Sequence, residues 1–436
     1  MKITPVTAQE LNFNDFLSTA LNNSYNLKIS QLEKEIAYKG VREAKAAYYP
    51  TLSAFATTER YNDLTNGNAQ ITAVGNEILL NRSYYQDMAA IGLSYNVFDF
   101  GIRKKQLDIA KADDKQKELL LQKDSRNLKL DAVDIYGEAL NLYKQSLIKS
   151  ETLTLQNELV DINKRLRKAG ELSDIDLVDS EITSAETKTE LDEISNSLAK
   201  KLTEVSFYTN EDYDTNSLTL QDFPSNPEEI ADNSDGLLKA TVEILDFIPE
   251  QSFEAQAATL EILKKQKEYE IQKKTNFPKI RFDTRYNFYG SDPNNLFNSL
   301  GDISQRSFTI RFSASMVLFD GFKNLNTISK KKLEIEKIKI EKDKQIAELK
   351  KKYEQIQLDY KNAIVQSRNN AVTLDLVNKN LDNLKRLNAN GIVARAECIR
   401  KQIELLKKKQ ELEQNQIKHF VSRYKMQILR EDSENL

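Results

Sequence analysis

The stretch NVFDFGIRKKQLDIAK occupies residues 96–111, and a similar stretch, MVLFDGFKNLNTISKK, occupies residues 316–331. In both, an apolar run passes through Phe-Asp and a glycine into a lysine-rich segment with helical spacing. The two junctions lie 221 positions apart, counted from Asp99 to Asp320. A junction that recurs deep in the second half of the chain indicates an internal duplication.

Helix-breaking residues are rare after each junction. Between residues 102 and 223 there is no proline, and the only glycines are Gly137 and Gly170; after Gly321 the only glycine is Gly391. Apolar residues in both tracts recur every three or four positions, a coiled-coil spacing that requires a partner helix. These positions are Leu128, Ala132, Ile135, Ala139, Leu142, Leu155, Leu159, Ile162, Leu166 and Ala169, then Ile346, Leu349, Tyr353, Ile356, Tyr360, Leu374, Val377, Leu381 and Leu384.

Each tract is interrupted once, by RKAGELSDIDL at residues 167–177 and by NANGIVARAEC at residues 388–398. Glycine can end a helix in a left-handed conformation, and Ser173 or Asp174 can cap the start of the next helix. The sequence therefore predicts two long antiparallel helical hairpins, over residues 101–207 with a tip near 170 and over residues 321–426 with a tip near 391.

Alternation with a period of two precedes each hairpin and predicts four strands, over about 50–61, 85–98, 278–290 and 306–319. Pro50 and Pro278 each end a preceding helix and begin an extended segment. Alternating runs of about 10 residues suit the strands of a membrane β-barrel. They suit a half-buried sheet in water equally well.

The predicted fold is mainly helical with some strands, and it is internally duplicated. The first structural repeat covers residues 8–207 and the second covers residues 251–428. A turn-rich linker is expected at 208–250 and a C-terminal tail at 429–436. Each repeat runs from a helix through two strands into a long helical hairpin.

Composition argues against several classes of function. The net charge of −3 provides no basic field for nucleic acid. The single cysteine, Cys398, allows no intramolecular disulfide, and the single histidine, His419, lacks the neighbours of a metal cluster or catalytic triad. No phosphate-binding loop or nucleophile motif is present. We therefore expect no enzyme activity, cofactor or metal.

The predicted strands have a consequence for assembly. Four strands are too few to close a barrel, and an open sheet edge cannot face lipid. If the strands enter a membrane, several chains must therefore share one barrel, and the hairpins must bury their apolar seams against neighbours. No long apolar helix is expected, and the start, MKITPVTAQELNF, lacks the apolar segment of a signal peptide.

The duplicated pattern resembles the TolC-like outer-membrane efflux proteins, also called outer membrane factors. The resemblance rests on a proline before each strand pair, Phe-Asp-x-Gly or Phe-Asp-Gly at each junction, and an acidic residue six positions after each tip glycine. It extends from about residue 11 to about residue 426. It implies a homotrimer with a twelve-stranded outer-membrane barrel and a periplasmic tunnel of helices.

The resemblance also implies a function. The chain would be the passive exit duct of a tripartite efflux pump or type I secretion system, carrying drugs or proteins. Its partners would be a periplasmic adaptor and an inner-membrane pump or ABC transporter. The residues matched to adaptor docking are Gly170, Glu171, Leu172, Ser173, Gly391, Ile392 and Val393.

The aperture residues matched to the family are Asp176 and Glu397, each of which three-fold symmetry would turn into a ring of carboxylates. The sequence departs from the family nearby. Asn388 and Val393 stand where some members have a gating tyrosine and an arginine, and Arg400 replaces a second acidic ring. We expect Arg400 to pair with Asp176 or Glu397 and to help hold the aperture closed.

Two other classes compete with the channel. A soluble periplasmic coiled-coil adaptor or scaffold would explain the hairpins, but it would not need aromatic-rich alternating strands in both halves. An α-helical pore-forming toxin would need a long apolar hairpin, which the sequence lacks.

Overall fold

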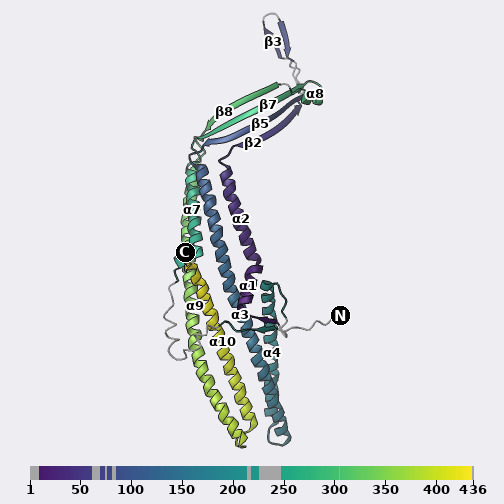
Figure 1. Ribbon diagram of the computed structural model, residues 1–436, viewed down its shortest axis with the longest axis vertical. Helices are drawn as coiled ribbons and strands as arrows, with labels where there is room; N and C mark the ends of the chain where they lie inside the picture. The colour runs from purple at the N-terminus through teal and green to yellow at the C-terminus, as the bar shows by residue number, and fades with distance from the viewer. Residues whose placement is uncertain are drawn as a thin grey trace. The chain divides into compact units, whose positions relative to one another are not determined.

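The computed structural model describes residues 9–60, 69–73, 76–80, 85–213, 218–224, 247–303 and 305–434. Figure 1 labels helices and strands that are described below. The chain divides into two compact units. The first unit consists of Met1–Glu33, Glu118–Ala257 and Lys342–Leu436, and the second of Lys34–Lys117 and Ala258–Glu341. Each unit takes segments from both halves of the sequence, so the compact units and the predicted repeats divide the chain differently.

The second unit contains a four-stranded antiparallel sheet. Its strands, in spatial order, are β2 (Thr51–Arg60), β5 (Tyr85–Phe98), β7 (Lys279–Asp292) and β8 (Gln305–Ser315). The pairing of β5 with β7 joins strands from the two halves of the sequence. The four predicted strands are all present, although residue 61 of the first lies outside the described residues.

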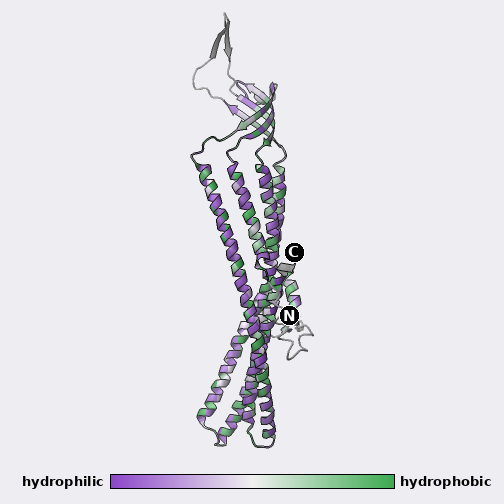
Figure 2. Ribbon diagram, turned by 90° about the vertical axis from the view of Figure 1, so that its left-hand side faces the viewer, coloured by the Kyte–Doolittle hydropathy of each residue, from purple (hydrophilic) through white to green (hydrophobic). Residues whose placement is uncertain are grey.

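The sheet has one apolar and one polar face. Side chains alternate along a strand, and directly paired residues share a face. The apolar face carries Leu52, Ile91, Leu93, Phe282, Tyr286, Phe308, Ile310 and Phe312. Much of it is exposed in the single chain, including 70% of Phe312. Figure 2 shows hydrophobic and hydrophilic residues mixed along these strands.

The predicted strand at 306–319 is too long at its end. β8 stops at Ser315, which pairs with Lys279, the first residue of β7. The residue before Lys279 is Pro278, which has no N–H group to extend the ladder. The four residues after Ser315 therefore have no strand partner and lead into the next helix instead.

The strand connections contain short elements that the sequence did not predict. In the first connection, β3 (Ala69–Ala73) and β4 (Asn76–Leu80) form a two-stranded ribbon. In the second, α8 (Leu296–Gly301) makes a single short helix.

The repeated Phe-Asp junction has a local structural cause. Phe100 and Gly101 at the first junction, and Gly321 and Phe322 at the second, all have positive φ. The Asp99 carboxylate accepts hydrogen bonds from the backbone N–H of Gly101 (3.1 Å) and of Arg103 (3.0 Å). Asp320 accepts one from the N–H of Asn324 (2.9 Å). Each aspartate thus caps the helix that follows a two-residue left-handed turn.

The two long hairpins match their predicted positions. The first consists of α3 (Ile102–Lys168) and α4 (Asp174–Thr209), and the second of α9 (Lys323–Ala389) and α10 (Arg395–Glu434). Helices α3 and α9 each contain 67 residues. The start and end of α9, and the start of α10, each lie 221 positions after their counterparts in the first hairpin.

The C-terminal tail predicted at 429–436 is wrong in its start, because α10 continues to Glu434. Leu429 is fully buried, so the core of the first unit holds this part of the helix. The predicted linker at 208–250 is described only in part. It contains the end of α4, a short strand β6 (Leu218–Leu220) and the start of a 3-10 helix η1 (Pro249–Gln251). Residues 214–217 and 225–246 lie outside the described part.

The core of the first unit surrounds Tyr136 of α3. β6 pairs in parallel with β1 (Gln9–Leu11), and the Tyr136 hydroxyl lies 2.9 Å from the Leu11 carbonyl and 2.6 Å from the Gln221 carbonyl. Burial raises the pKa of this hydroxyl, and the charge of Asp222 adds to the effect. Most of the predicted seam positions, including Ala132, Ala139, Tyr353 and Leu381, are buried, so that prediction is confirmed.

Three further helices, α1, α2 and α7, lie in the described residues. The segment predicted as one helix before the first strand is broken at Ser24 into α1 (Phe13–Asn23) and α2 (Tyr25–Ala46), and the Ser24 hydroxyl accepts a hydrogen bond from the N–H of Leu27 (3.3 Å). Helix α7 (Phe253–Lys273) precedes the third strand, β7.

Candidate functional site

The tip of the first hairpin is a capped turn. Gly170 has φ +79°, and the N–H groups of Gly170 and Glu171 donate to the carbonyls of Arg167 (3.1 Å) and Leu166 (2.9 Å), which is a Schellman motif. The Ser173 hydroxyl accepts a hydrogen bond from the Asp176 N–H (3.1 Å) and donates to the Asp176 carboxylate (2.6 Å). Ser173 is therefore the N-cap, and Asp176 is held by that cap.

An ion pair links the two helices at the same tip. The guanidinium of Arg167 donates two hydrogen bonds to the Asp174 carboxylate, one of them at 2.7 Å from Nη2 to Oδ2. The hydrogen bond and the charge of Arg167 lower the pKa of Asp174, and the pKa of Arg167 is raised in return. Both groups lie in solvent, so the pair fixes the turn more than it stabilises the fold.

The tip of the second hairpin uses the same backbone with different side chains. Gly391 has φ +73°, and the N–H groups of Gly391 and Ile392 donate to the carbonyls of Asn388 (2.9 Å) and Leu387 (3.0 Å). The Asn388 side chain donates to the Val393 carbonyl (2.7 Å). The position that matches Ser173 is Ala394, which has no side-chain oxygen to cap α10.

Two of the candidate aperture residues form a pair. Arg400 Nη1 lies 3.2 Å from Glu397 Oε2, and both side chains are more than half exposed. Asp176 contacts Ser173 instead, and no ion pair joins it to Arg400 in the described part of the chain. Of the two expected partners of Arg400, the structure shows Glu397. Its role in closing an aperture stays a prediction.

The two hairpins differ in how the helix after each tip packs. On α10, Ala396 and Ile399 are buried against Leu159 of α3, and Arg395 lies 3.1 Å from Glu158 of α3. On α4, the matching positions are Ile175 and Val178, which are 73% and 50% exposed. Ile182 is 49% exposed and continues this surface, which we call the α4 stripe.

A second exposed stripe runs along α9 and was missed by the sequence analysis. Leu358, Val365 and Val372 are each more than half exposed and lie seven positions apart, and Leu376 extends the row. We call these four residues the α9 stripe. The heptad spacing was visible in the sequence. The predicted seam, which includes Tyr353, Ile356 and Tyr360, lies on the opposite side of the helix.

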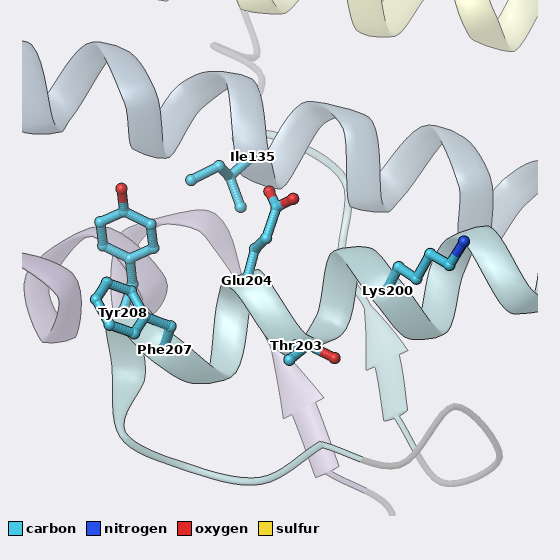
Figure 3. A pocket seen from close by; sticks show the side chains of 6 residues that line it. All are labelled: Ile135, Lys200, Thr203, Glu204, Phe207 and Tyr208. Atoms are coloured by element: carbon cyan, nitrogen blue, oxygen red, sulfur yellow. The ribbon is translucent and has the colours of Figure 1, made fainter.

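A cavity of the first unit lies beside the end of α4. Its volume is about 580 Å³, and Figure 3 shows the six side chains that line it: Ile135, Lys200, Thr203, Glu204, Phe207 and Tyr208. Only Ile135 comes from α3; the other five come from α4. Lys201, next to this lining, pairs with Glu204 and with Glu138. The lining combines apolar surface with the Glu204 carboxylate, the Lys200 amine and the hydroxyls of Thr203 and Tyr208.

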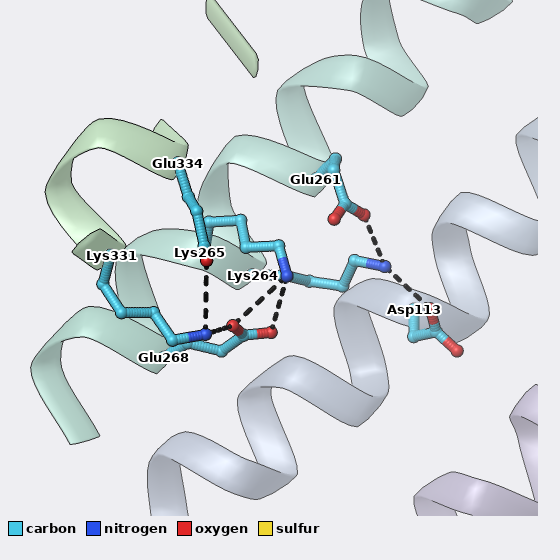
Figure 4. Close-up of polar contacts among 7 residues, drawn as sticks. All are labelled: Asp113, Glu261, Lys264, Lys265, Glu268, Lys331 and Glu334. Carbon is cyan, nitrogen blue, oxygen red and sulfur yellow. Dashed lines mark hydrogen bonds and ion pairs between the residues drawn. The ribbon is translucent and has the colours of Figure 1, made fainter. Parts of the chain in front are cut away.

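A network of charges ties three helices together in the second unit (Figure 4). Lys264 of α7 lies 2.8 Å from Asp113 of α3 and 2.7 Å from Glu261. Glu268 of α7 pairs with Lys265 and with Lys331 of α9. Burial opposes ionisation of Glu268, but its hydrogen bonds from the two lysines outweigh that effect and lower its pKa. These pairs fix the helices that enter and leave the sheet.

Neither a metal centre nor a helical membrane span is found in the described residues. Clusters of three or more His, Cys, Asp or Glu side chains that could hold a metal ion are absent from this part of the chain. Over the same residues, no helix combines the length and the apolar character that a membrane crossing requires.

Comparison with known proteins identifies the fold. Residues 16–211 match the family model described as outer membrane efflux protein. The Campylobacter jejuni CmeC outer membrane channel superposes with a TM-score of 0.77 at 13% identity, covering 96% of this chain and 85% of that chain. VceC from Vibrio cholerae gives 0.73 at 14% identity, covering 96% and 95%.

A structure of the open state of the Neisseria gonorrhoeae MtrE outer membrane channel gives a TM-score of 0.62 at 13% identity, covering 98% of this chain and 93% of that chain. Among curated proteins, none matches the chain in sequence. The predicted resemblance to the outer membrane efflux proteins is thus confirmed, by the family model over residues 16–211 and by the shared fold over almost the whole chain.

Proposed function

We propose that the chain is one subunit of an outer-membrane channel that acts as the exit duct of an efflux pump or type I secretion system. Three copies would form a twelve-stranded barrel in the outer membrane, continued by a helical tunnel in the periplasm. The observation that carries the proposal is the pair of open edge strands, β2 and β8, together with the exposed apolar stripes on α4 and α9, in the described residues.

The helical surfaces follow from the packing order. Contacts link α4 to α3 (Lys164 to Glu181, 3.2 Å), α3 to α10 (Arg395 to Glu158) and α10 to α9 (the His419 ring to the Tyr360 ring, 5.0 Å). The outer helices of this series are α4 and α9. The α4 stripe and the α9 stripe lie on these outer helices, so a ring of copies would bury one stripe against the other.

The sheet surfaces follow from strand direction. β2 and β8 are the edge strands, and the directions alternate across β2, β5, β7 and β8. The β8 edge of one copy can therefore pair antiparallel with the β2 edge of the next. Joining copies in this way satisfies the backbone groups of both edges, as a sheet in lipid requires. The exposed apolar face would then contact the acyl chains.

The hairpin tips would dock the pump assembly. We assign adaptor docking to the two capped turns, where Glu171, Leu172, Ile392 and Val393 follow the tip glycines. Asp176 and Glu397 would form carboxylate rings, and the Arg400–Glu397 pair would neutralise part of that charge. The channel itself would be passive, with a periplasmic adaptor and an inner-membrane pump supplying partner contacts and energy.

Arg400→Glu tests the aperture assignment. It breaks the pair with Glu397 and adds like charge, so single-channel conductance should rise and cation preference should increase. Lys188→Glu, an equal charge change on the exposed surface of α4, is the control. Unchanged conductance in the Arg400 variant would contradict a role of Arg400 in closing the aperture.

The proposed function is tested by purification from outer membranes in detergent, native mass spectrometry and planar-bilayer recording. We expect a trimer that conducts ions. A monomer that stays soluble without detergent and inserts no pores would contradict the proposal and would favour the coiled-coil adaptor. The fold comparisons give that alternative no support, since the similar structures CmeC and MtrE are described as outer membrane channels.

A further inference from the structure

The polar face of the sheet is strongly basic near the helical junctions. Arg281 and Arg285 of β7 lie four positions apart and therefore on the same face. Arg285 pairs with Thr309 of β8, which places Arg311, two positions further along β8, on that face too. Lys279 lies on the same face. Among the residues of this face near the junctions, Asp283 is the one acidic side chain.

The arginine side chains are laid across neighbouring strands. The guanidinium of Arg285 lies 4.9 Å from the centre of the Phe55 ring on β2, with β5 between them. Gly92 of β5 pairs directly with Arg285, and a Cβ at Gly92 would lie 4.0 Å from Arg285 Nε. The Arg285 side chain thus passes beside Gly92 toward β2, and the cation–π contact with Phe55 holds it there.

The remaining guanidinium groups keep donors for a ligand. Arg281 donates from Nε to the Asn96 side chain at 3.4 Å, which leaves its terminal nitrogens unused by that bond. Arg311 lies opposite Asp283 in the register. Within the described part of the chain, neither Arg285 nor Arg311 forms an ion pair at 4.0 Å or less, and all three arginines are exposed. An arginine fork matches carboxylate and phosphate oxygens.

We propose that Arg281, Arg285 and Arg311, together called the arginine band, attract and guide anionic solutes through the barrel. The proposal rests on the proposed function, because it requires the polar face to line the lumen. Three copies would bring the band round the whole pore, and a charged lining of one sign concentrates its counter-ions. Solutes bearing carboxylate or phosphate groups are the class of cargo that this lining favours.

The test compares purified channels in planar bilayers under a KCl gradient, with the reversal potential as the readout. The variant carries Arg281→Gln, Arg285→Gln and Arg311→Gln. The ratio of chloride to potassium permeability should fall by about tenfold at low salt, and by less at high salt because ions screen the band. Citrate added to the wild-type channel should reduce the chloride current, and the variant should lose this effect.

Two controls isolate the band. Arg306 lies on β8, like Arg311, but on the opposite face of the sheet, 6.0 Å from the centre of the Phe288 ring. The variant Arg306→Gln should leave the permeability ratio unchanged. Replacing the three band residues by lysine keeps the charge and should keep the chloride to potassium permeability ratio close to that of wild type. The lysine variant also keeps the proposal testable if the glutamine variant fails to assemble.

The outcomes separate this proposal from the proposed function. A wild-type chain that makes no pore contradicts the channel itself. A conducting channel whose permeability ratio is the same in wild type and glutamine variant overturns the arginine band, as does an equal shift in the Arg306 control. A ratio in the lysine variant as low as in the glutamine variant would also overturn a role based on charge.

Discussion

The helices that follow the two hairpin tips, α4 and α10, begin with nearly the same backbone, but matching side chains in their first turns differ in exposure. Val178 on α4 is half exposed, while its counterpart 221 positions later, Ile399 on α10, is fully buried. Ile175 and Ala396 show the same contrast, at 73% and 7% exposure. The first turns of α10 are buried against α3, whereas the matching turns of α4 stay exposed in the single chain. The two repeats therefore share a backbone, but only one of the two matching surfaces is covered within the single chain.

The largest effect should come from charging the open interface. Val178→Asp with Ile182→Asp places two carboxylates in the α4 stripe, where burial in an assembly would leave them unpaired. We expect the trimer to be lost while the helical content of each subunit persists. Native mass spectrometry and circular dichroism measure the two quantities.

Lys188→Glu is the control for that variant, because it adds negative charge to α4 outside the stripe. It should leave the trimer intact. If the doubly charged variant still formed a trimer of wild-type stability, the α4 stripe could not be the contact between copies.

A smaller effect should separate the buried position from its exposed counterpart. Ile399→Ala removes a fully buried side chain, so the free energy of unfolding should fall by about 2–4 kcal/mol. Val178→Ala removes a half-exposed one, and the subunit should lose less than about 1 kcal/mol. Denaturant unfolding under dissociating detergent conditions gives both values. Equal losses would mean that α4 and α10 are packed alike within the subunit.

The third prediction uses the histidine that only the second hairpin contains. His419 packs on the Tyr360 ring, and its position in the first hairpin is occupied by the buried Leu198. Burial and the nearby charge of Arg423 lower the pKa of His419 from 6.5 to about 4. The unfolded chain therefore binds a proton more readily than the folded one between these values, so stability falls as the pH falls through this window.

His419→Leu should remove this part of the pH dependence. Wild type should lose up to about 1.4 kcal/mol of unfolding free energy per pH unit more than the variant between pH 6.5 and 4. Denaturant midpoints measured at pH 7, 6 and 5 for both proteins test this. Parallel curves for the two proteins would show that His419 titrates normally in the folded state.

The smallest effect concerns the caps. Ser173→Ala gives the first tip the residue that the second tip has at Ala394, and it should cost about 1 kcal/mol. Ala394→Ser is the reciprocal change and should add a few tenths to about 1 kcal/mol if the serine adopts the same geometry. Thermal unfolding of the two variants beside wild type measures the difference. No change in either would mean that the tips are stabilised by Arg167–Asp174 and Asn388 alone.

Most of the fold could be predicted from the sequence, because the spacing of apolar residues and the positions of glycine and proline indicate its helices and strands. The near absence of glycine and the lack of proline predicted α3 and α9, and the tip glycines predicted their ends. The short strands β1 and β6 could not be predicted, since each has three residues and depends on Tyr136, far away in the sequence. The end of α10 was missed because burial of Leu429 depends on tertiary contacts.

The candidate site was predicted unevenly. The tip residues and the Arg400–Glu397 contact follow from local spacing, which a sequence shows directly. The exposure of the α4 stripe does not, because Ile175 and Ala396 look alike until the partner helix is known. Gly137 shows the same limit: a Cβ there would lie 2.5 Å from Val421 of α10, while its counterpart on α9 is the exposed Leu358. Only the packing explains why one is glycine and the other leucine.

The open strand edges have a consequence for how such a subunit must be made. β2 and β8 are different edges, so copies would join head to tail, and every unfinished assembly would still display one of each. Growth would stop only when the last β8 met the first β2. A subunit with one blocked edge would still pair with a neighbour through its other edge. A minority of such subunits could therefore hold intact subunits in incomplete assemblies that cannot close.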